Sequence, residues 1–401
     1  MSGYAFFSSE SVTEGHPDKL CDQISDAIID KFLQQDPYAE VTAECAVAKG
    51  IVFIATRFAS LASVDVTEVA RSIITEIGYR KVDFDGRTCS VVTSLNESPL
   101  VDAYRFEPDD LTENEIEQIA AVNQASVFGF ACRQTNVLMP LPIWLAHKLA
   151  RRLTTARLGG VLPYLRPDGK TFVGVEYQNR QPFRIHTIVI STQYYLPAAQ
   201  PSVEKKLEED ISGHVIKPVF QDELLQPDRN TRVLINPEGE FTVGGPARDT
   251  GLTGRKIMVD TYGGYARHGG SAISGKDLTN VGRIGVYAAR YVAKNLVAAG
   301  IAEECEVHLS YAIGKSRPIS IDIDTFNTGR CHDERIREVV QELFDLRPAA
   351  ILRQFRLRHL PSVRRDGFYR KIAAYGQVGR MDIALPWEKT DRVDDLRKAF
   401  G

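Results

Sequence analysis

The sequence predicts an α+β protein of three similar repeats, each a sheet covered by helices on one face, arranged around a pseudo-threefold axis. An order of helix, hairpin, helix and strand recurs along the 401 residues. The composition, 43% hydrophobic and 25% charged, supplies enough apolar side chains for a sizeable core. We therefore expect an N-terminal repeat over residues 1–100, a lid or linker over 101–124, a central repeat over 125–240 and a C-terminal repeat over 241–401.

Each repeat is expected to begin with a helix, because apolar residues recur there at helical spacing. These helices are residues 18–35, 142–157 and 280–299. Two strand-like runs follow each helix: 41–49 with 51–59, 171–178 with 183–192, and 305–314 with 319–326. A second helix comes next at 66–77, 203–216 and 334–344, and strands at 88–95 and 231–236 end the first two repeats. The second face of each sheet should be apolar and should seek a partner subunit.

The segment between the first two repeats is acidic and is expected to be an ordered lid. Residues 96–124 carry eight acidic side chains, and residues 111–120 have a helical pattern. Thr112 is placed to cap this helix, and Glu115 stands three residues later as its reciprocal partner. Long segments between elements often act as lids.

Charge and cysteine content exclude several classes of protein. A net charge of -3 argues against a nucleic-acid binder that works through bulk positive charge. The six cysteines lie far apart without a C-x-x-C pair, which argues against structural zinc and a disulfide scaffold and fits a reducing cytosol. No apolar run approaches the length of a membrane span, and the first residues do not have a signal peptide's long apolar core. These features predict a cytoplasmic protein that binds neither nucleic acid nor membrane.

A glycine-rich stretch at residues 249–277 is the best candidate for a ligand site. Its glycines are interleaved with cations: Arg255, Lys256, Arg267, His268 and Lys276. Glycine lets the backbone approach a ligand closely, and the cations supply fixed positive charge. The pattern indicates a site for a polyanion such as a phosphate chain. The apolar run KIMVDTY within it (residues 256–262) has the pattern of a buried strand.

Several short motifs occur together, in one order, from end to end of the chain. They are GHPDK, LRPDGK, GLTGRK, DTYGG, ARHGG, SGKD, LSYAIG and the terminal PWEKTD. His16 and Asp18 around a proline, just before a helix N-terminus that favours anions, would be weak evidence alone. The complete series is specific, and the chain resembles the S-adenosylmethionine synthetases (methionine adenosyltransferases). The resemblance implies the three-repeat fold and a homodimer or dimer of dimers with active sites shared between subunits.

The resemblance also implies roles for individual residues. Contacts with ATP would come from His16, Asp168, Lys170, Phe241, Asp249, Arg255, Lys256 and Lys276. Asp18 would bind Mg²⁺, and Glu44 would lie at a K⁺ site. In the family, methionine sulfur attacks C5′ of ATP, and tripolyphosphate leaves whole before it is hydrolysed to pyrophosphate and phosphate. A leaving group with this much negative charge departs readily only where cations and a metal ion stabilise that charge. Catalysis would therefore depend on His16, Lys170, Arg255, Lys256 and Lys276.

The departures from the family pattern cluster at the acceptor end of the site. Arg57 and Glu97 replace a glutamate and a glutamine, and Asn123 and Asn280 replace an aspartate and a lysine. Gly282 replaces a magnesium-binding aspartate, so a second metal should bind weakly or elsewhere, and tripolyphosphate hydrolysis should be slowed or lost.

These departures leave several functions open. Methionine or an analogue could bind with reversed polarity, Arg57 taking its carboxylate and Glu97 its ammonium. The acceptor could instead be a different thioether with a carboxylate but no α-amine. A triphosphate-releasing ATP hydrolase and a non-catalytic nucleotide-binding regulator are the remaining alternatives. The intact phosphate-site residues favour an active transferase.

Overall fold

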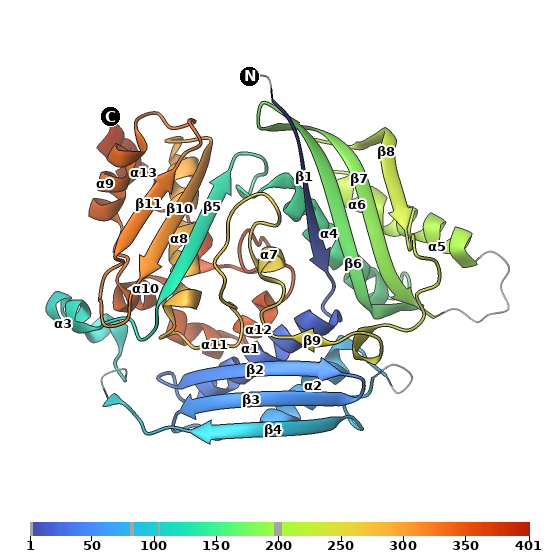
Figure 1. The fold of residues 1–401 in the computed structure, drawn as a ribbon, viewed down its shortest axis with the longest axis horizontal. Coiled ribbons are helices and arrows are strands. Elements are labelled where there is room, and N and C mark those ends of the chain that lie inside the picture. Colours follow the sequence, from blue (N-terminus) through green and yellow to red (C-terminus); the bar gives the residue numbers. More distant parts are fainter. Residues whose placement is uncertain (1–2, 81–83, 103–104, 196–202) are drawn as a thin grey trace.

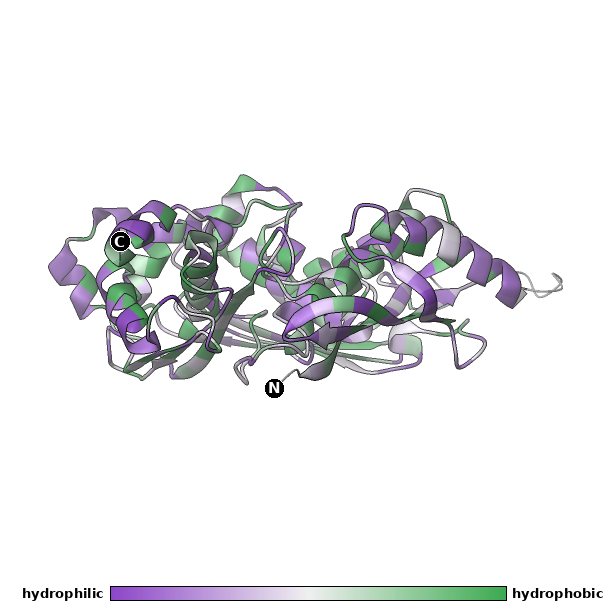
Figure 2. Cartoon of the chain, turned by 90° about the horizontal axis from the view of Figure 1, so that it is seen from above, coloured by the Kyte–Doolittle hydropathy of each residue, from purple (hydrophilic) through white to green (hydrophobic). Residues whose placement is uncertain are grey.

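The computed structural model describes residues 3–80, 84–102, 105–195 and 203–401. Three sheets form within these ranges, and helices cover one face of each sheet (Figure 1). Seen from above, the sheets lie along one side of the molecule and the helices along the other (Figure 2). The predicted α+β fold of three sheet-and-helix units is confirmed.

The three sheets share one plan, because each is built on an antiparallel hairpin. The hairpins are β2 (Glu40–Ala48) with β3 (Ile51–Ala59), β6 (Leu165–Gln178) with β7 (Gln181–Tyr194), and β10 (Glu304–Tyr311) with β11 (Ser320–Asp324). In two sheets another strand runs parallel to the second hairpin strand: β4 (Ser90–Glu97) beside β3, and β8 (Pro227–Ile235) beside β7. Each of these strands overlaps a predicted run.

A strand from a distant part of the chain completes each sheet, and the sequence patterns did not reveal these strands. They are β1 (Tyr4–Val12) on β6, β5 (Ala125–Cys132) on β10, and β9 (Gly251–Leu252) on β2. Each added strand is antiparallel to the first strand of a hairpin. The three units are therefore joined through their backbones, and β9 holds the glycine-rich stretch against the N-terminal sheet.

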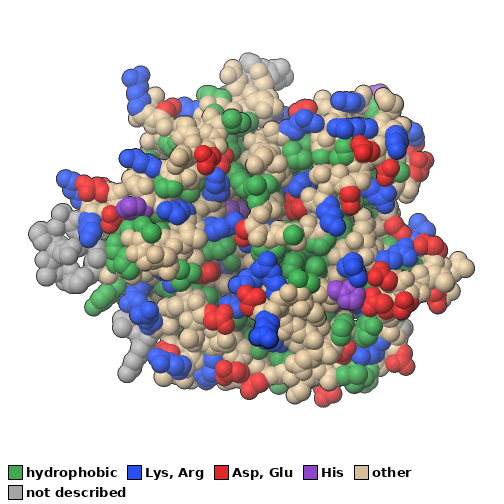
Figure 3. Space-filling model, turned by 180° about the vertical axis from the view of Figure 1, so that it is seen from behind, with side chains coloured by type: hydrophobic (Ala, Val, Ile, Leu, Met, Phe, Trp, Pro, Cys, Tyr) green, Lys and Arg blue, Asp and Glu red, His purple; other side chains and the backbone are tan. Residues whose placement is uncertain are grey.

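The helices cover the sheets as predicted, with additions near the C-terminus. The covering helices are α1 (Pro17–Gln35), α2 (Val66–Ile77), α4 (Leu141–Leu158), α5 (Val203–Ile211), α6 (Lys217–Phe220), α8 (Val281–Ala299) and α9 (Asp333–Leu343). Four short helices were not predicted: α10 (Pro348–Phe355), α11 (Leu360–Val363), α12 (Tyr369–Ile372) and α13 (Val393–Phe400). Basic and acidic side chains are interspersed over this helical side (Figure 3), in keeping with the small net charge. Within the described ranges, no helix is both long and apolar enough to cross a membrane.

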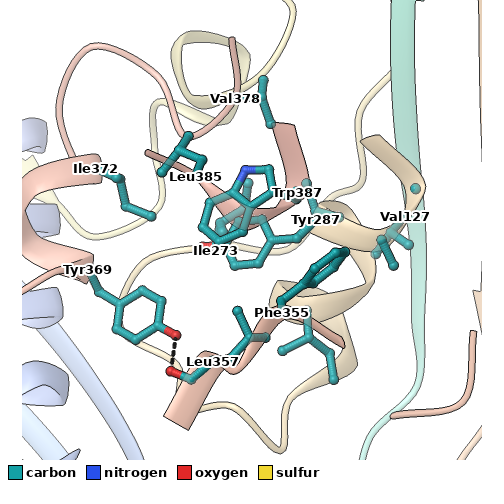
Figure 4. Packing of buried hydrophobic residues seen from close by; sticks show 14 of the residues in the cluster. Val127, Ile273, Tyr287, Phe355, Leu357, Tyr369, Ile372, Val378, Leu385 and Trp387 are labelled. Carbon is teal, nitrogen blue, oxygen red and sulfur yellow. Dashed lines mark hydrogen bonds between the residues drawn. The ribbon is translucent and has the colours of Figure 1, made fainter. Parts of the chain in front are cut away.

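The C-terminal segment packs an aromatic core against α8. Trp387 is fully buried and stacks on Tyr287, with ring centroids 3.8 Å apart (Figure 4). The buried Tyr369 hydroxyl donates a hydrogen bond to the Leu357 carbonyl at 2.9 Å. Since each large ring fills a position that no small side chain could fill, the last residues are part of the core rather than an appendage.

The predicted strand at residues 256–262 is wrong. Residues Ile257–Asp260 form one helical turn, α7, and the Asp260 N–H donates to the Lys256 carbonyl at 2.9 Å. The turn ends where Gly263 adopts a φ of 64°. A short buried apolar run does not by itself distinguish a strand from a helical turn.

Residues 105–124 are bound to the C-terminal helices. The helix α3 (Glu113–Gln118) begins with the predicted capping box of Thr112 and Glu115. Ile116 is fully buried in a small cluster with Ala349 and Ala350 of α10. Two glutamates of α3 form ion pairs with arginines: Glu113 with Arg347 and Arg353, and Glu117 with Arg317 and Arg347. The predicted helix is confirmed, and its role as a lid stays a prediction.

We expect Arg347→Ala to loosen this segment, because Arg347 forms ion pairs with two glutamates of α3, Glu113 and Glu117. Partly exposed ion pairs contribute little to global stability, so the free energy of unfolding should fall by about 1 kcal/mol or somewhat more. Cleavage by a glutamate-specific protease within residues 105–124 should become faster. Arg335→Ala is the matched control, because Arg335 pairs with Glu338 on the exposed side of α9. Equal resistance of wild type and Arg347→Ala would show that these ion pairs do not hold the segment.

Candidate active site

The helix α1 carries a carboxylate at every fourth position, a spacing that places the four side chains on one face. They are Asp18, Asp22, Asp26 and Asp30, each at most 3% exposed. The first three accept backbone hydrogen bonds from the glycine-rich stretch, from the N–H groups of Leu252 (3.1 Å), Gly254 (2.8 Å) and Gly275 (2.9 Å). The helix therefore fixes the path of the stretch that was predicted to bind phosphate.

Cations gather around the N-terminus of α1. His16 is the N-cap residue, and its Nδ1 accepts a hydrogen bond from the Asp18 N–H at 3.2 Å. Lys256 Nζ and Arg255 Nη1 lie 3.8 and 3.7 Å from the two carboxylate oxygens of Asp18. Burial lowers the pKa of His16 to about 2, and the charges of Lys170 and Lys256 contribute next. His16 is therefore a neutral imidazole, and since Nδ1 accepts, its proton lies on Nε2.

A cavity of about 170 Å³ adjoins this group through Lys170. Four predicted nucleotide contacts, Asp168, Lys170, Phe241 and Asp249, line it together. Asp168 is buried and accepts a hydrogen bond from the Gly245 N–H at 2.7 Å. Burial raises the pKa of Asp168 to about 6, although the Gly245 hydrogen bond opposes this shift. An aromatic face, two carboxylates and a lysine suit a nucleoside whose phosphates point toward Lys170.

A second cavity, of about 250 Å³, brings together Arg57, Asn123 and Asn280. The two asparagines bind each other and the start of α8: Asn123 Nδ2 donates to Asn280 Oδ1 at 3.1 Å, and the Val281 N–H donates to Asn123 Oδ1 at 3.1 Å. Glu40 also lines this cavity. Its pKa is raised by burial and then by the neighbouring Asp277, while the charge of Arg57 acts in the opposite direction.

Glu97 is not among the residues that line this cavity. In the parallel pairing of β3 with β4, Arg57 stands opposite Asn96 and Glu97 stands opposite Phe58. Because side chains alternate between the two faces of a sheet, Glu97 and Arg57 belong to opposite faces. The structure thus groups three of the four predicted acceptor contacts.

Lys276 and Glu44 lie near this second cavity. Lys276 forms a bridge with Thr42, two residues before Glu44 on β2. Burial and then Arg283 lower the pKa of Lys276, whereas the Glu44 carboxylate acts to raise it. A Cβ placed on Gly282 would be 3.6 Å from Lys276 Nζ, so a carboxylate at that position would contact the lysine. The absence of a side chain at Gly282 therefore changes the surroundings of Lys276 directly.

Within one chain the predicted site residues other than Glu97 form two separate groups. We call the residues around the first cavity and the α1 N-terminus the phosphate group; it comprises His16, Asp18, Asp168, Lys170, Phe241, Asp249, Arg255 and Lys256. The acceptor group comprises Glu44, Arg57, Asn123, Lys276 and Asn280. Lys276 pairs with β2 at Thr42. The strand β9, which precedes Arg255 and Lys256 in the chain, pairs with β2 at Val47. Five residues of extended strand span about 17 Å, so the groups lie toward opposite ends of β2.

The sequence patterns missed several residues near the phosphate group. Arg248 lines the nucleotide cavity, with its guanidinium carbon 5.2 Å from the centre of the Phe241 ring. Lys19, Asp22 and Asp260 form a fully buried charged cluster beneath Arg255 and Lys256. The one available signal was the four-residue spacing of the aspartates in α1, which includes Asp22.

The chain is similar to known proteins over nearly its whole length. Sequence models of the S-adenosylmethionine synthetase N-terminal, central and C-terminal domains match residues 4–99, 118–241 and 243–389. The S-adenosylmethionine synthase of Thermosynechococcus vestitus is 52% identical, over 98% of this chain and 97% of that protein. Those of Rippkaea orientalis and Trichodesmium erythraeum are 50% and 49% identical, each over 100% of this chain and 98% of the relative. The chain belongs to the S-adenosylmethionine synthetase family and is an enzyme of the methionine adenosyltransferase type.

Proposed function

We propose that this protein joins C5′ of ATP to the sulfur of a thioether and releases tripolyphosphate. The observation that carries the proposal is the gathering of Lys170, Arg255 and Lys256 around the α1 N-terminus, beside the cavity lined by Asp168 and Phe241. The sulfur lone pair attacks C5′, the bond from C5′ to the phosphate oxygen breaks, and that oxygen takes the electron pair. The products are a sulfonium and a polyanion whose charge a preorganised cationic site stabilises.

His16 would assist departure of the phosphate chain without adding charge. Its lowered pKa keeps the ring neutral, and the hydrogen bond from the Asp18 N–H to Nδ1 leaves Nε2 as the donor. A neutral donor at this position can bind an oxygen of the leaving group throughout the reaction. The positive charge then comes from the neighbouring lysines and arginine.

Mg²⁺ would fit beside Asp18. Among the described residues, no group of three or more histidines, cysteines, aspartates and glutamates is placed to hold a metal ion alone. Mg²⁺ commonly takes one or two protein carboxylates and completes its shell with phosphate oxygens and water, which suits Asp18. The ion would neutralise charge on the leaving phosphate chain. Glu44 offers one carboxylate for K⁺, whose other ligands would have to come from outside this group.

We infer that two copies of the chain complete each active site. The phosphate and acceptor groups lie toward opposite ends of β2, so a twofold axis that pairs the sheets antiparallel would set one group against the other. The outer face of the N-terminal sheet is suited to this contact. It exposes Ile51, Phe53 and Val92, with 53%, 44% and 49% of their surface accessible. An exposed apolar patch of this kind is typical of a protein interface.

The acceptor is proposed to bind through its carboxylate at Arg57. Arg57 shares the second cavity with the amides of Asn123 and Asn280, and Glu40 lies in the same cavity as a partner for an ammonium. This arrangement supports methionine or an analogue with reversed polarity, in which Glu40 rather than Glu97 takes the ammonium. A thioether acid without an amine is the second candidate, because Arg57 alone suffices for its carboxylate.

The proposal is tested by the products. Purified protein with ATP, Mg²⁺, K⁺ and a panel of thioether acids should yield an adenosylated sulfonium detectable by mass spectrometry. Intact tripolyphosphate should accumulate beside it, because Gly282 supplies no carboxylate for a second metal. Detection of pyrophosphate and phosphate without tripolyphosphate would contradict the expected accumulation of tripolyphosphate, but not the adenosyl transfer. ATP turnover without a sulfonium would indicate a hydrolase, and absence of any turnover would indicate a nucleotide-binding regulator.

A further inference from the structure

We propose that the buried cluster of Lys19, Asp22 and Asp260 is a clamp that positions Arg255 and Lys256 for the phosphate chain. The inference rests on the proposed function, because it concerns the same cations. None of the three clamp residues lines the cavity at Asp168 and Phe241. Each acts through the turn that carries Arg255 and Lys256. They are therefore positioning residues rather than catalytic ones.

The clamp holds this turn on both sides of the two cations. Before them, the Gly254 N–H donates to Asp22 Oδ1 at 2.8 Å. After them, Asp260 Oδ1 accepts from Lys19 Nζ at 2.5 Å, and the Asp260 N–H bonds back to the Lys256 carbonyl. Lys19 Nζ also donates to Asp22 Oδ2 at 2.9 Å, which closes the connection between the two sides. A segment fixed at both ends leaves its central residues little freedom to shift.

The space around the turn enforces the same path. Gly254 has a φ of 81°, and a Cβ there would lie 2.3 Å from the Ala272 Cβ. Thr253 is bound as well, because its hydroxyl lies 2.7 Å from Ser25 Oγ on α1 and accepts from the Cys45 N–H at 2.9 Å. The turn is thus fitted between α1 and β2, and Asp22 fixes its start at Gly254.

The charge of the clamp argues for a role beyond stability. Lys19 and Asp22 are fully buried and Asp260 is 1% exposed, so one ammonium is buried with two carboxylates. Asp260 Oδ2 has no hydrogen-bond partner among the described residues. Buried charges of this kind often stabilise a fold less than apolar residues of similar volume would. A clamp that sets the position of two catalytic cations explains why this costly arrangement is present.

Tripolyphosphate affinity tests the clamp, because a displacement of about 1 Å in a charged site can cost a large factor in binding or rate. We expect Asp22→Asn and Asp260→Asn to bind tripolyphosphate at least about tenfold more weakly by isothermal titration calorimetry. Both variants should bind adenosine as the wild type does, since the cavity at Asp168 and Phe241 does not touch the clamp.

The matched control is Asp30→Asn. Asp30 lies on the same face of α1, is 1% exposed and accepts from the N–H groups of Tyr369 and Arg370, but it does not bind the glycine-rich stretch. This variant should lose thermal stability and keep its tripolyphosphate affinity. Should Asp22→Asn fail to fold, Asp260→Asn, which retains both hydrogen bonds of Asp22, decides the question.

Unchanged tripolyphosphate affinity in the clamp variants, or an equal loss in Asp30→Asn, would overturn the clamp. A parallel loss of adenosine affinity would overturn it too, because that result indicates general disruption of the fold. Failure of the wild-type protein to bind tripolyphosphate would contradict the proposed function itself.

Discussion

Co-expression of two inactive variants should restore about one quarter of wild-type activity, because in the proposed dimer the phosphate and acceptor groups of each site come from different subunits. The variants are Lys256→Met in the phosphate group and Lys276→Met in the acceptor group. Each alone should lower kcat by about 100-fold or more, since each removes one preorganised charge from the leaving phosphate chain. The measurement is the rate of adenosylated product formation per mole of total dimer, with each variant purified alone for comparison.

The quarter follows from random pairing. Half of the dimers combine the two variants, and each mixed dimer has one site with both substitutions and one with neither. Lys31→Met provides the control, because Lys31 is an exposed lysine of α1 whose ammonium donates a 3.4 Å hydrogen bond to Gln34. That variant should be active alone. Activity of the mixture no greater than that of the separate variants would show that one chain supplies both lysines to its own site.

The helices were predicted well because their signals are local. The second helix begins and ends at the predicted residues, Val66 and Ile77, since Asp65 caps its start and Gly78 ends it in the left-handed conformation. The missed strands β1, β5 and β9 have the opposite character. Each forms only where it meets a partner far away in sequence, and the two-residue β9 has no periodicity to detect. The apolar run at α7 is too short for its pattern to distinguish a strand from a helical turn, and its conformation depends on the residues that surround it in the fold.

The motifs suggested which residues belong to the candidate site, but they did not predict how these residues are arranged. The sequence predicted that His16, Lys170 and Lys256 act together, and the structure places them around one helix N-terminus. It did not predict that Lys276 lies with the acceptor group, because position along the chain carries no information about which end of β2 a loop meets. The clamp was missed for another reason. A lysine and two aspartates have the composition of surface residues, and only the fold shows that they are buried.

Arg57→Glu should shift the preference for acceptors toward methionine. At 4 Å and an effective dielectric of about 20, an ion pair is worth roughly 4 kcal/mol, so replacing a cation by an anion can change the interaction by up to ~8 kcal/mol. Solvent reduces this value, because Arg57 is exposed on the outer face of β3 in a single chain. One quarter of the full change still exceeds tenfold in kcat/KM, at about 1.4 kcal/mol per factor of ten.

The measurement compares kcat/KM for methionine with that for a thioether acid of the same length without the amine. With Arg57 the carboxylate of both compounds is attracted, so the wild-type ratio depends on whether Glu40 also binds the ammonium of methionine. In the Arg57→Glu variant the carboxylate is repelled and an ammonium is attracted, so the ratio should move toward methionine by about tenfold or more. Arg57→Gln should fall between the two, because it removes the attraction without adding repulsion. Arg232→Glu makes the same charge change on an exposed strand of another sheet and should leave the ratio unaltered. An unaltered ratio in Arg57→Glu would rule out both proposed acceptors, methionine with reversed polarity and the thioether acid without an amine, since each requires a cation at this position.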